Sequence, residues 1–299
     1  MSLPEEDSSS GISRFCAIDI GTNAMRAVFA LDKRGSPYFF NNLRFPIRLG
    51  ESVFALGELS TDKITLLKDS LFKIREKMDE FDIPLSSTKV VATSAMRNSR
   101  NQEEVCQEIK QDVGFEIEVI NGNLEANLIA SAVNLVFPNK NALIFDIGGG
   151  STELVIKEGT KAQKIQSIPV GTIRMLEDKN SKELERIFST RLDQFLNGDP
   201  PEFLIGTGGN LRRIGKIKTL FFGGSSKSAA LHEVIEINHA VALMSRKQRV
   251  NNLGLRADRA DVIDKALNLV LKIMKKNNFD EILLPRVGLK EGVIQHYFF

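Results

Sequence analysis

The chain has 299 residues, a formal net charge of +2, and 42% apolar and 26% charged residues. This length exceeds one ordinary core and suits two domains, and the composition is typical of a folded protein rather than a disordered one. A net charge so close to zero gives no support to a nucleic-acid partner, because a polyanion would need cations gathered locally. The two cysteines exclude a disulfide framework and a four-ligand metal site, which favours a reducing, cytoplasmic location.

The first residues, 1–12, contain acids and serines where a secretory signal would need a basic start and an apolar stretch. We expect this segment to be a disordered tail. No later apolar run reaches the length that spans a membrane, so no membrane partner is expected.

The most informative feature is an internal repeat, in which residues 15–31 align without gaps on residues 142–158. In each copy an apolar run ends in Asp-Ile-Gly, a loop of small residues follows, and a second apolar run returns. This pattern is typical of a β-hairpin and indicates that a whole domain was duplicated. We predict domain I at 13–128 and domain II at 129–299, with the segment 288–299 packing back on domain I.

Between the hairpins, apolar residues at three- and four-residue steps predict a helix from Ser60-Thr61 to before Pro84. The rest of the first half predicts, in order, a strand at 88–95, a helix at 101–113, a strand at 115–120 and a helix at 123–137. The second half predicts a strand at 163–168, a helix at 182–196, a strand at 202–206, a loop at 206–210, a long helix across 259–276 and a strand at 281–285. Because strands alternate with helices, the fold class is α/β with mixed sheets.

The repeat places Asp19 and Asp146 at equivalent positions, each near the carboxyl end of a strand and two residues before glycine. Two carboxylates that face one another across a cleft between the domains suit a hydrated Mg²⁺. Glu153 follows Asp146 on the returning strand, where the first copy has Arg26. Glu153 is a candidate ligand for metal or water, and Arg26 a candidate to neutralise phosphate. Two alternatives remain. Each Asp is also suited to forming the turn after its strand, and Arg26 and Glu153 are also suited to cross-strand ion pairs.

Loops without bulky side chains allow successive backbone N–H groups to converge on phosphate oxygens. Three such loops occur here, and their candidate phosphate-binding residues are Gly21, Thr22, Asn23, Gly148, Gly149, Gly150, Ser151, Gly208 and Gly209. The helix expected after the third loop contains Arg212, Arg213, Lys216 and Lys218. These cations fit either further phosphates or an ordinary solvated helix face.

Several segments occur together in one order: DIGTNAMR, ATSAMRNSRN, EVINGNLEANLI, FDIGGGSTELV, IPVGTIRM, GTGGN, RADRADVI and GLKEG. Through them the chain resembles, from about Phe15 to Phe298, the exopolyphosphatase and guanosine pentaphosphate phosphohydrolase (Ppx/GppA) family of the actin-like ATPase superfamily. The resemblance implies two actin-like (ribonuclease H-like) domains with mixed sheets flanked by helices, and an active site in the inter-domain cleft. It is to the short, two-domain form of the family.

The same resemblance implies that Glu125 is the catalytic carboxylate, which orients or deprotonates the attacking water, and that Arg97 lies over phosphate. It implies an exopolyphosphatase that uses Mg²⁺ to release terminal orthophosphate from inorganic polyphosphate, with guanosine pentaphosphate as a further substrate. The chain departs from the family pattern at four positions that leave substrate preference and turnover open: Ala24, Leu124, Asn210 and Lys290.

Two other functions remain compatible with the glycine loops. An ATP-dependent small-molecule kinase shares them but would need a second substrate pocket and an Asp that activates the acceptor, for which the sequence offers no clear candidate. A non-catalytic polyphosphate or alarmone sensor would keep the loops without turnover. A homodimer is a compatible assembly, and the sequence ranks neither chain-length preference nor processivity.

Overall fold

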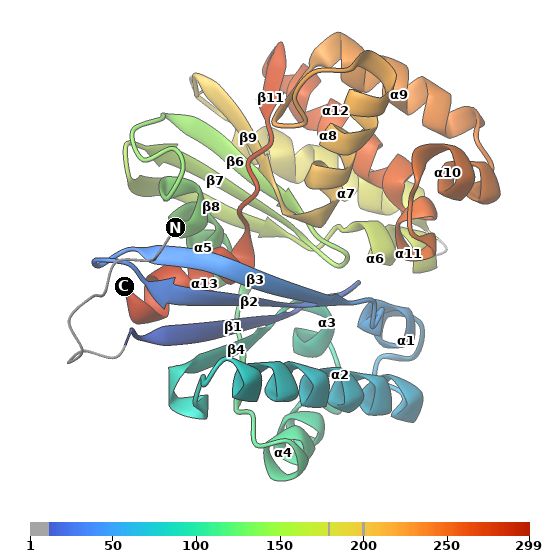
Figure 1. Ribbon diagram of the computed structural model, residues 1–299. Helices are drawn as coiled ribbons and strands as arrows, with labels where there is room; N and C mark the ends of the chain where they lie inside the picture. The colour runs from blue at the N-terminus through green and yellow to red at the C-terminus, as the bar shows by residue number, and fades with distance from the viewer. Residues whose placement is uncertain (1–11, 179, 199–200) are drawn as a thin grey trace.

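The computed structural model describes residues 12–178, 180–198 and 201–299. The expected tail at 1–12 therefore lies outside the described residues, apart from residue 12. The described chain forms two mixed β-sheets, each flanked by helices (Figure 1). This is the actin-like α/β architecture that the sequence predicts.

The first sheet has the strand order β3-β2-β1-β4-β5, in which β1, β2 and β3 are antiparallel and β4 and β5 run parallel to β1. Its buried strands are rich in branched and aromatic residues, which favour extended backbone. The bounds are β1 (Arg14–Ile20), β2 (Met25–Asp32), β3 (Pro37–Phe45), β4 (Thr88–Ala92) and β5 (Ile117–Val119).

The second sheet has the order β10-β11-β9-β6-β7-β8, and its β8-β7-β6-β9-β11 part repeats the connectivity of the first sheet. The bounds are β6 (Ala142–Ile147), β7 (Thr152–Glu158), β8 (Lys161–Ile168), β9 (Phe203–Thr207), β10 (Ser228–Ala230) and β11 (Glu281–Leu283). In the two hairpins Asp19 pairs with Arg26 and Asp146 with Glu153, so the duplication seen in the sequence is a duplication in space.

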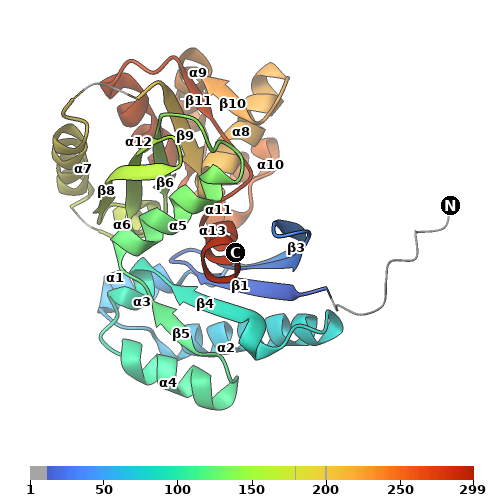
Figure 2. The ribbon, with the colours of Figure 1, turned by 90° about the vertical axis from the view of Figure 1, so that its left-hand side faces the viewer.

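Helices cover the outer face of each sheet (Figures 1 and 2). The helical bounds in the first half are α1 (Leu49–Leu56), α2 (Thr61–Glu80), the 3₁₀ turn η1 (Leu85–Ser87), α3 (Ser94–Arg97), α4 (Gln102–Asp112) and α5 (Gly122–Asn134). Those in the second half are α6 (Thr172–Glu177), α7 (Ser181–Phe195), α8 (Gly208–Phe222), α9 (Leu231–Leu243), α10 (Arg246–Leu253), α11 (Ala257–Ala260), α12 (Ile263–Lys276) and α13 (Leu289–Phe298). No helix in the described ranges combines the length and apolarity needed to cross a membrane.

Helices α5 and α13 lie between the two sheets and pack on the inner face of both (Figure 1). The boundary predicted between residues 128 and 129 falls inside α5, so this helix belongs to the cores of both halves. Helix α13 reaches the first sheet, where Phe298 stacks on Phe15 with ring centroids 4.6 Å apart. Apolar residues therefore fill the space between the sheets and hold them at a fixed separation.

Three predicted elements differ from the structure. The strand predicted at 88–95 ends at Ala92, and α3 follows it. The predicted loop at 206–210 is instead the end of β9 and the first turn of α8. The long helix predicted across 259–276 is instead two helices, α11 and α12, because Val262 leaves helical geometry with φ −125° and ψ −6°. The periodicity of apolar side chains does not reveal a break of this kind at a single residue.

The contact between α13 and α5 depends on Gly292, since a methyl group there would overlap the Leu128 backbone carbonyl. We expect Gly292→Ala to lower the free energy of unfolding by about 3 kcal/mol, because helix backbones must move apart to admit the methyl group. Urea unfolding followed by circular dichroism measures this. The control is Asn127→Ala on the exposed side of α5, expected within about 0.5 kcal/mol of wild type. Equal stability of the two variants would contradict the close packing.

Candidate active site

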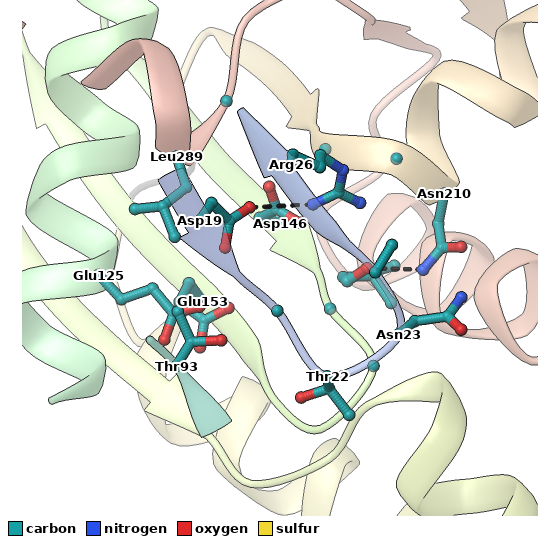
Figure 3. Close-up of a pocket in the computed structure, with 18 of the residues that line it drawn as sticks. Asp19, Thr22, Asn23, Arg26, Thr93, Glu125, Asp146, Glu153, Asn210 and Leu289 are labelled. Atoms are coloured by element: carbon teal, nitrogen blue, oxygen red, sulfur yellow. Dashed lines mark hydrogen bonds and ion pairs between the residues drawn. The ribbon is translucent and has the colours of Figure 1, made fainter. Parts of the chain in front are cut away.

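The predicted site residues, with the exception of Arg97, line one small cleft of about 60 Å³ between the two hairpins (Figure 3). They reach it from the ends of β1 and β6, from the loops that follow those strands, from β2 and β7, and from the first turns of α5 and α8. Strand ends, loops and helix N-termini of both halves thus converge at one place, as expected for open α/β sheets.

Asp19 and Asp146 lie side by side in the middle of the cleft (Figure 3). The Arg26 guanidinium donates to Asp19 at 3.0 Å, and the Thr207 hydroxyl donates to Asp146 at 2.9 Å. Burial raises the pKa of both carboxyl groups, and the charge of Asp146 raises that of Asp19 further, while Arg26 opposes both shifts. The centre of the cleft is therefore an acidic pair that favours a nearby positive charge.

Glu125 and Glu153 form a second acidic pair beside Thr93 (Figure 3). Glu125 lies in the first turn of α5, which Asn121 caps by accepting a hydrogen bond from the Leu124 backbone N–H at 2.9 Å. Burial, followed by the charge of Glu153, raises the pKa of Glu125 well above its usual value. Burial also raises the pKa of Glu153 to about 7. A carboxylate with such a pKa is suited to accept a proton from water near neutral pH.

Arg97 lies behind Glu125 and outside the lining of the cleft. Its guanidinium donates to the Ile120 carbonyl at 2.6 Å and lies 3.5 Å from the Glu125 carboxylate. In this structure Arg97 therefore orients Glu125 and lowers its pKa. The expectation that Arg97 contacts phosphate stays a prediction.

The two glycine loops touch each other across the cleft. A methyl group at Gly149 would lie 2.9 Å from the Thr22 side chain. The backbone N–H groups of Thr172 and Ile173, at the start of α6, bind the carbonyls of Gly148 and Gly149 at 3.0 and 2.7 Å. The Gly148 N–H binds the Ser151 carbonyl at 2.9 Å, so the N–H groups of Gly149, Gly150 and Ser151 are the candidates for binding an anion.

A groove of about 290 Å³ continues outward from the cleft and is lined mainly by cations. Burial lowers the pKa of several of its arginines, most strongly that of Arg259, and neighbouring arginines lower it further. Within the described ranges, the acids that pair with these cations are Asp19, Asp258 and Glu291, so positive charge remains in excess. Cations held so close together favour a ligand with several negative charges. The cations that line this groove are Arg26, Arg44, Arg212, Arg213, Lys216, Arg256, Arg259 and Lys290.

Several polar contacts connect the halves on the side of the cleft away from α5, among them the ion pair of Arg44 with Asp258 and the hydrogen bond from the Asn23 side-chain amide to the Asp258 carbonyl at 3.1 Å. Arg48, just before α1, pairs with Asp261 at 2.9 Å. Arg174 of α6 lies over the Phe54 ring of α1, with 4.1 Å between the guanidinium carbon and the ring centroid. These polar and cation–π contacts close the cleft opposite the apolar α5–α13 layer.

The donor set at the centre of the cleft fits Mg²⁺. Asp19 and Asp146 offer only carboxylate oxygens, and a divalent cation would relieve their mutual repulsion. Mg²⁺ commonly takes one or two carboxylates and completes its coordination with phosphate and water. In residues 12–178, 180–198 and 201–299, no three His, Cys, Asp or Glu side chains are arranged as a metal cluster. The expectation that Glu153 joins the two aspartates as a ligand stays a prediction.

Comparison with known proteins shows the family and the fold of the chain. The model of the Ppx/GppA phosphatase family matches residues 28–297. The chain belongs to this family. It superposes on the Aquifex aeolicus family member with a TM-score of 0.78 and 26% identity, covering 95% of this chain and 97% of that one. An exopolyphosphatase structure from Cytophaga hutchinsonii gives a TM-score of 0.84 at 24% identity, over 94% and 96% of the two chains, and supports the fold.

Curated relatives of this family member are longer. A guanosine-5'-triphosphate,3'-diphosphate pyrophosphatase from Photobacterium profundum is 24% identical over 293 residues, which cover 94% of this chain and 58% of that protein. A relative of the same name from Aeromonas salmonicida is 25% identical over 293 residues, which also cover 94% of this chain and 58% of that protein. The chain thus spans little more than half the length of these relatives.

Sequence reasoning missed several residues of the site. Arg259 lies in RADRADVI, a segment typical of the family for which the sequence suggests no role, and it lines the cleft and the groove. Lys290, which the sequence marks only as a departure from the family pattern, lines both as well. Arg44 and Arg256 carry no local signal, because only the tertiary fold brings β3 beside α11. Lys218, by contrast, is a sequence candidate for phosphate but pairs with Glu233 at 3.4 Å outside the groove.

Substitution of Gly208 tests how tightly the centre of the cleft is packed. Its φ is +81°, and a methyl group there would overlap the Asp146 carboxylate. We expect Gly208→Ala to lower the free energy of unfolding by roughly 2–4 kcal/mol, through backbone strain and displacement of Asp146. Gly35→Ala is the matched control, since Gly35 has a φ of +77° and open space around it. Gly35→Ala should cost about 1 kcal/mol in the same urea unfolding experiment, and an equal cost at both positions would exclude the overlap.

Substitution of Glu153 tests the electrostatics of the cleft. Because its pKa is raised above the unfolded value of 4.5, the native state prefers the neutral carboxyl group, and the stability lost grows as pH rises toward about 7. In metal-free protein we expect Glu153→Gln to raise the free energy of unfolding at pH 8 by about 2–3 kcal/mol, with little gain at pH 4. Thermal melts with EDTA across this range measure the difference.

The control for that experiment is Glu118→Gln. Lys89 and Tyr297 lower the pKa of Glu118 against the effect of burial, so its contribution is present at neutral pH and is lost in acid. The Glu118 variant should therefore lose stability at pH 8, opposite in sign to the Glu153 variant. A pH-independent effect of Glu153→Gln would contradict the raised pKa.

Proposed function

We propose that the protein is an exopolyphosphatase that releases terminal orthophosphate from inorganic polyphosphate, with guanosine pentaphosphate as a further substrate of the same site. The observation that carries this proposal is the cation-lined groove that leads out of the cleft. A single phosphate needs only the cleft, whereas a row of cations outside it suits a chain of phosphates. Both proposed substrates present such a chain.

The arrangement of the cleft suits attack by water on a terminal phosphate. Glu125 and Glu153 lie at one end, Asp19 and Asp146 in the middle, and Arg26 on the side of the groove (Figure 3). Phosphoryl transfer needs the attacking and leaving oxygens in line and charge neutralisation around the phosphate. We assign water to the Glu125 end and the leaving chain to the Arg26 end.

Glu125 is proposed as the base that orients the water and accepts its proton. Burial and the charge of Glu153 raise its pKa well above the usual value, which makes it a stronger base than a free carboxylate, and Arg97 lies 3.5 Å from its carboxylate. The N–H groups of Gly149, Gly150 and Ser151 and the N-terminus of α8 would bind the phosphate oxygens. Mg²⁺ bound by Asp19 and Asp146 would neutralise charge on the phosphate when present.

The names of similar proteins support both substrates. The Photobacterium profundum relative is named for a guanosine nucleotide and the Cytophaga hutchinsonii structure for polyphosphate. The groove suits either ligand, since each presents several phosphates to the same cations.

Phosphate release tests this proposal. Purified protein with Mg²⁺ is incubated with polyphosphate, with guanosine pentaphosphate, or with ATP plus sugars, and free phosphate is followed. We expect release from at least one of the first two substrates, its loss with EDTA, and a fall in kcat of about 10²–10⁴-fold in Glu125→Gln. Glu118→Gln, outside the cleft, should keep wild-type activity.

Three outcomes would contradict the proposal. Phosphate that appears only on an acceptor would indicate a kinase. Binding of polyphosphate without release under any divalent metal would indicate a sensor. Release that is unchanged in Glu125→Gln would refute the assignment of the base.

A further inference from the structure

The cleft and the groove meet at a junction lined by residues common to both. These shared residues are Arg26, Gly209, Arg212, Arg259 and Lys290. If the terminal phosphate lies in the cleft and the remaining chain in the groove, the bond that breaks lies at this junction. The cations at the junction are therefore the groups nearest to the leaving oxygen.

The three arginines of the junction already have partners within the protein. Arg26 donates to Asp19 at 3.0 Å, and Arg259 donates to the Asn210 side-chain carbonyl at 2.7 Å. The Arg212 Nε donates to the Gly208 carbonyl at 3.4 Å, in its own helix. These bonds fix the arginines as the walls of the junction.

Lys290 has a different environment. It lies in the first turn of α13, is only 6% exposed, and pairs with its neighbour Glu291, which is 5% exposed. Burial lowers the pKa of Lys290, Glu291 opposes this shift, and Arg212 and Arg26 lower the pKa further. Lys290 in turn lowers the pKa of Asp19 in the cleft. Its ammonium group is thus held between the acidic centre of the cleft and the cations of the groove.

The backbone beside Lys290 also points to a phosphate. A methyl group at Gly288 would lie 3.7 Å from the Gly208 backbone nitrogen, so the segment that leads into α13 lies against the N-terminus of α8. This N-terminus carries free N–H groups and the positive end of a helix dipole. A phosphate bound there would lie next to the start of α13 and receive the Lys290 charge.

We infer that Lys290 is a catalytic residue that contacts the leaving phosphate and neutralises the charge that develops on it. The bond between phosphorus and the water oxygen forms, and the bond between that phosphorus and the bridging oxygen breaks. The water proton passes to Glu125, and the bridging oxygen keeps the electron pair and stays with the shortened chain beside the Lys290 ammonium. Glu291 is a positioning residue that keeps this ammonium charged and in place.

This inference rests on the proposed function, so wild-type phosphate release from polyphosphate is measured first. With an active wild type, we expect Lys290→Met to lower kcat about 10²-fold with KM changed less than about threefold, as for loss of one transition-state donor. Lys290→Arg should retain kcat within about tenfold. Because Lys290→Met leaves Glu291 buried and unpaired, the double variant Lys290→Met/Glu291→Gln tests the same loss in a neutral background.

Two lysines of α8 serve as matched controls. Lys216 lines only the groove, so Lys216→Met should raise KM and make it less dependent on salt, with kcat close to wild type. Lys218 pairs with Glu233 outside the groove, so Lys218→Met should change neither parameter.

The outcomes separate the two proposals. No phosphate release by wild type from either substrate overturns the proposed function. An active wild type in which the folded double variant raises KM as Lys216→Met does, with kcat preserved, overturns only the role of Lys290. A loss of kcat confined to Lys290→Met and absent from the double variant would also overturn it.

Discussion

The structure depends on the burial of four carboxylates in one small cleft. Asp19, Asp146, Glu125 and Glu153 each lose hydration, and several of them raise the pKa values of their neighbours. Buried like charges are costly unless cations compensate them. The compensation is unequal, because Arg26 donates directly to Asp19 while Arg97 approaches Glu125 at 3.5 Å. The cleft therefore keeps an excess of negative charge, which is compensated when a cation or a proton binds.

The duplicated hairpins distribute charge unequally along the cleft. The same register places Arg26 opposite Asp19 in one sheet and Glu153 opposite Asp146 in the other. Backbone symmetry is thus combined with opposite charge, which makes one end of the cleft acidic and the other end continuous with the basic groove. A phosphate chain with water at its terminal end matches this gradient.

Much of this arrangement could be predicted from the sequence, because it depends on local patterns. The gapless repeat predicts the paired hairpins, and the strand-end positions of Asp19 and Asp146 predict that they meet. The orientation of Arg97 could not be predicted, since the Ile120 carbonyl that binds it is distant in the sequence. The groove could not be predicted either, because Arg44 and Arg256 come together only when β3 lies beside the second half.

The α5–α13 layer has a mechanical consequence for the cleft. The chain passes between the two halves through α5 and through the segment that leads into α13. Helix α5 packs on β7 and β8 of the second sheet and α13 on β1 and β2 of the first, and the two helices pack on each other in one apolar cluster. On the opposite side, the halves meet through polar contacts, which include the ion pairs of Arg48 with Asp261 and of Arg44 with Asp258 and the cation–π contact of Arg174 with Phe54. Water can hydrate charged groups that separate but cannot replace apolar packing. The halves are therefore joined by apolar packing along the α5–α13 layer and by polar contacts on the opposite side. Any widening of the cleft would begin at the polar contacts.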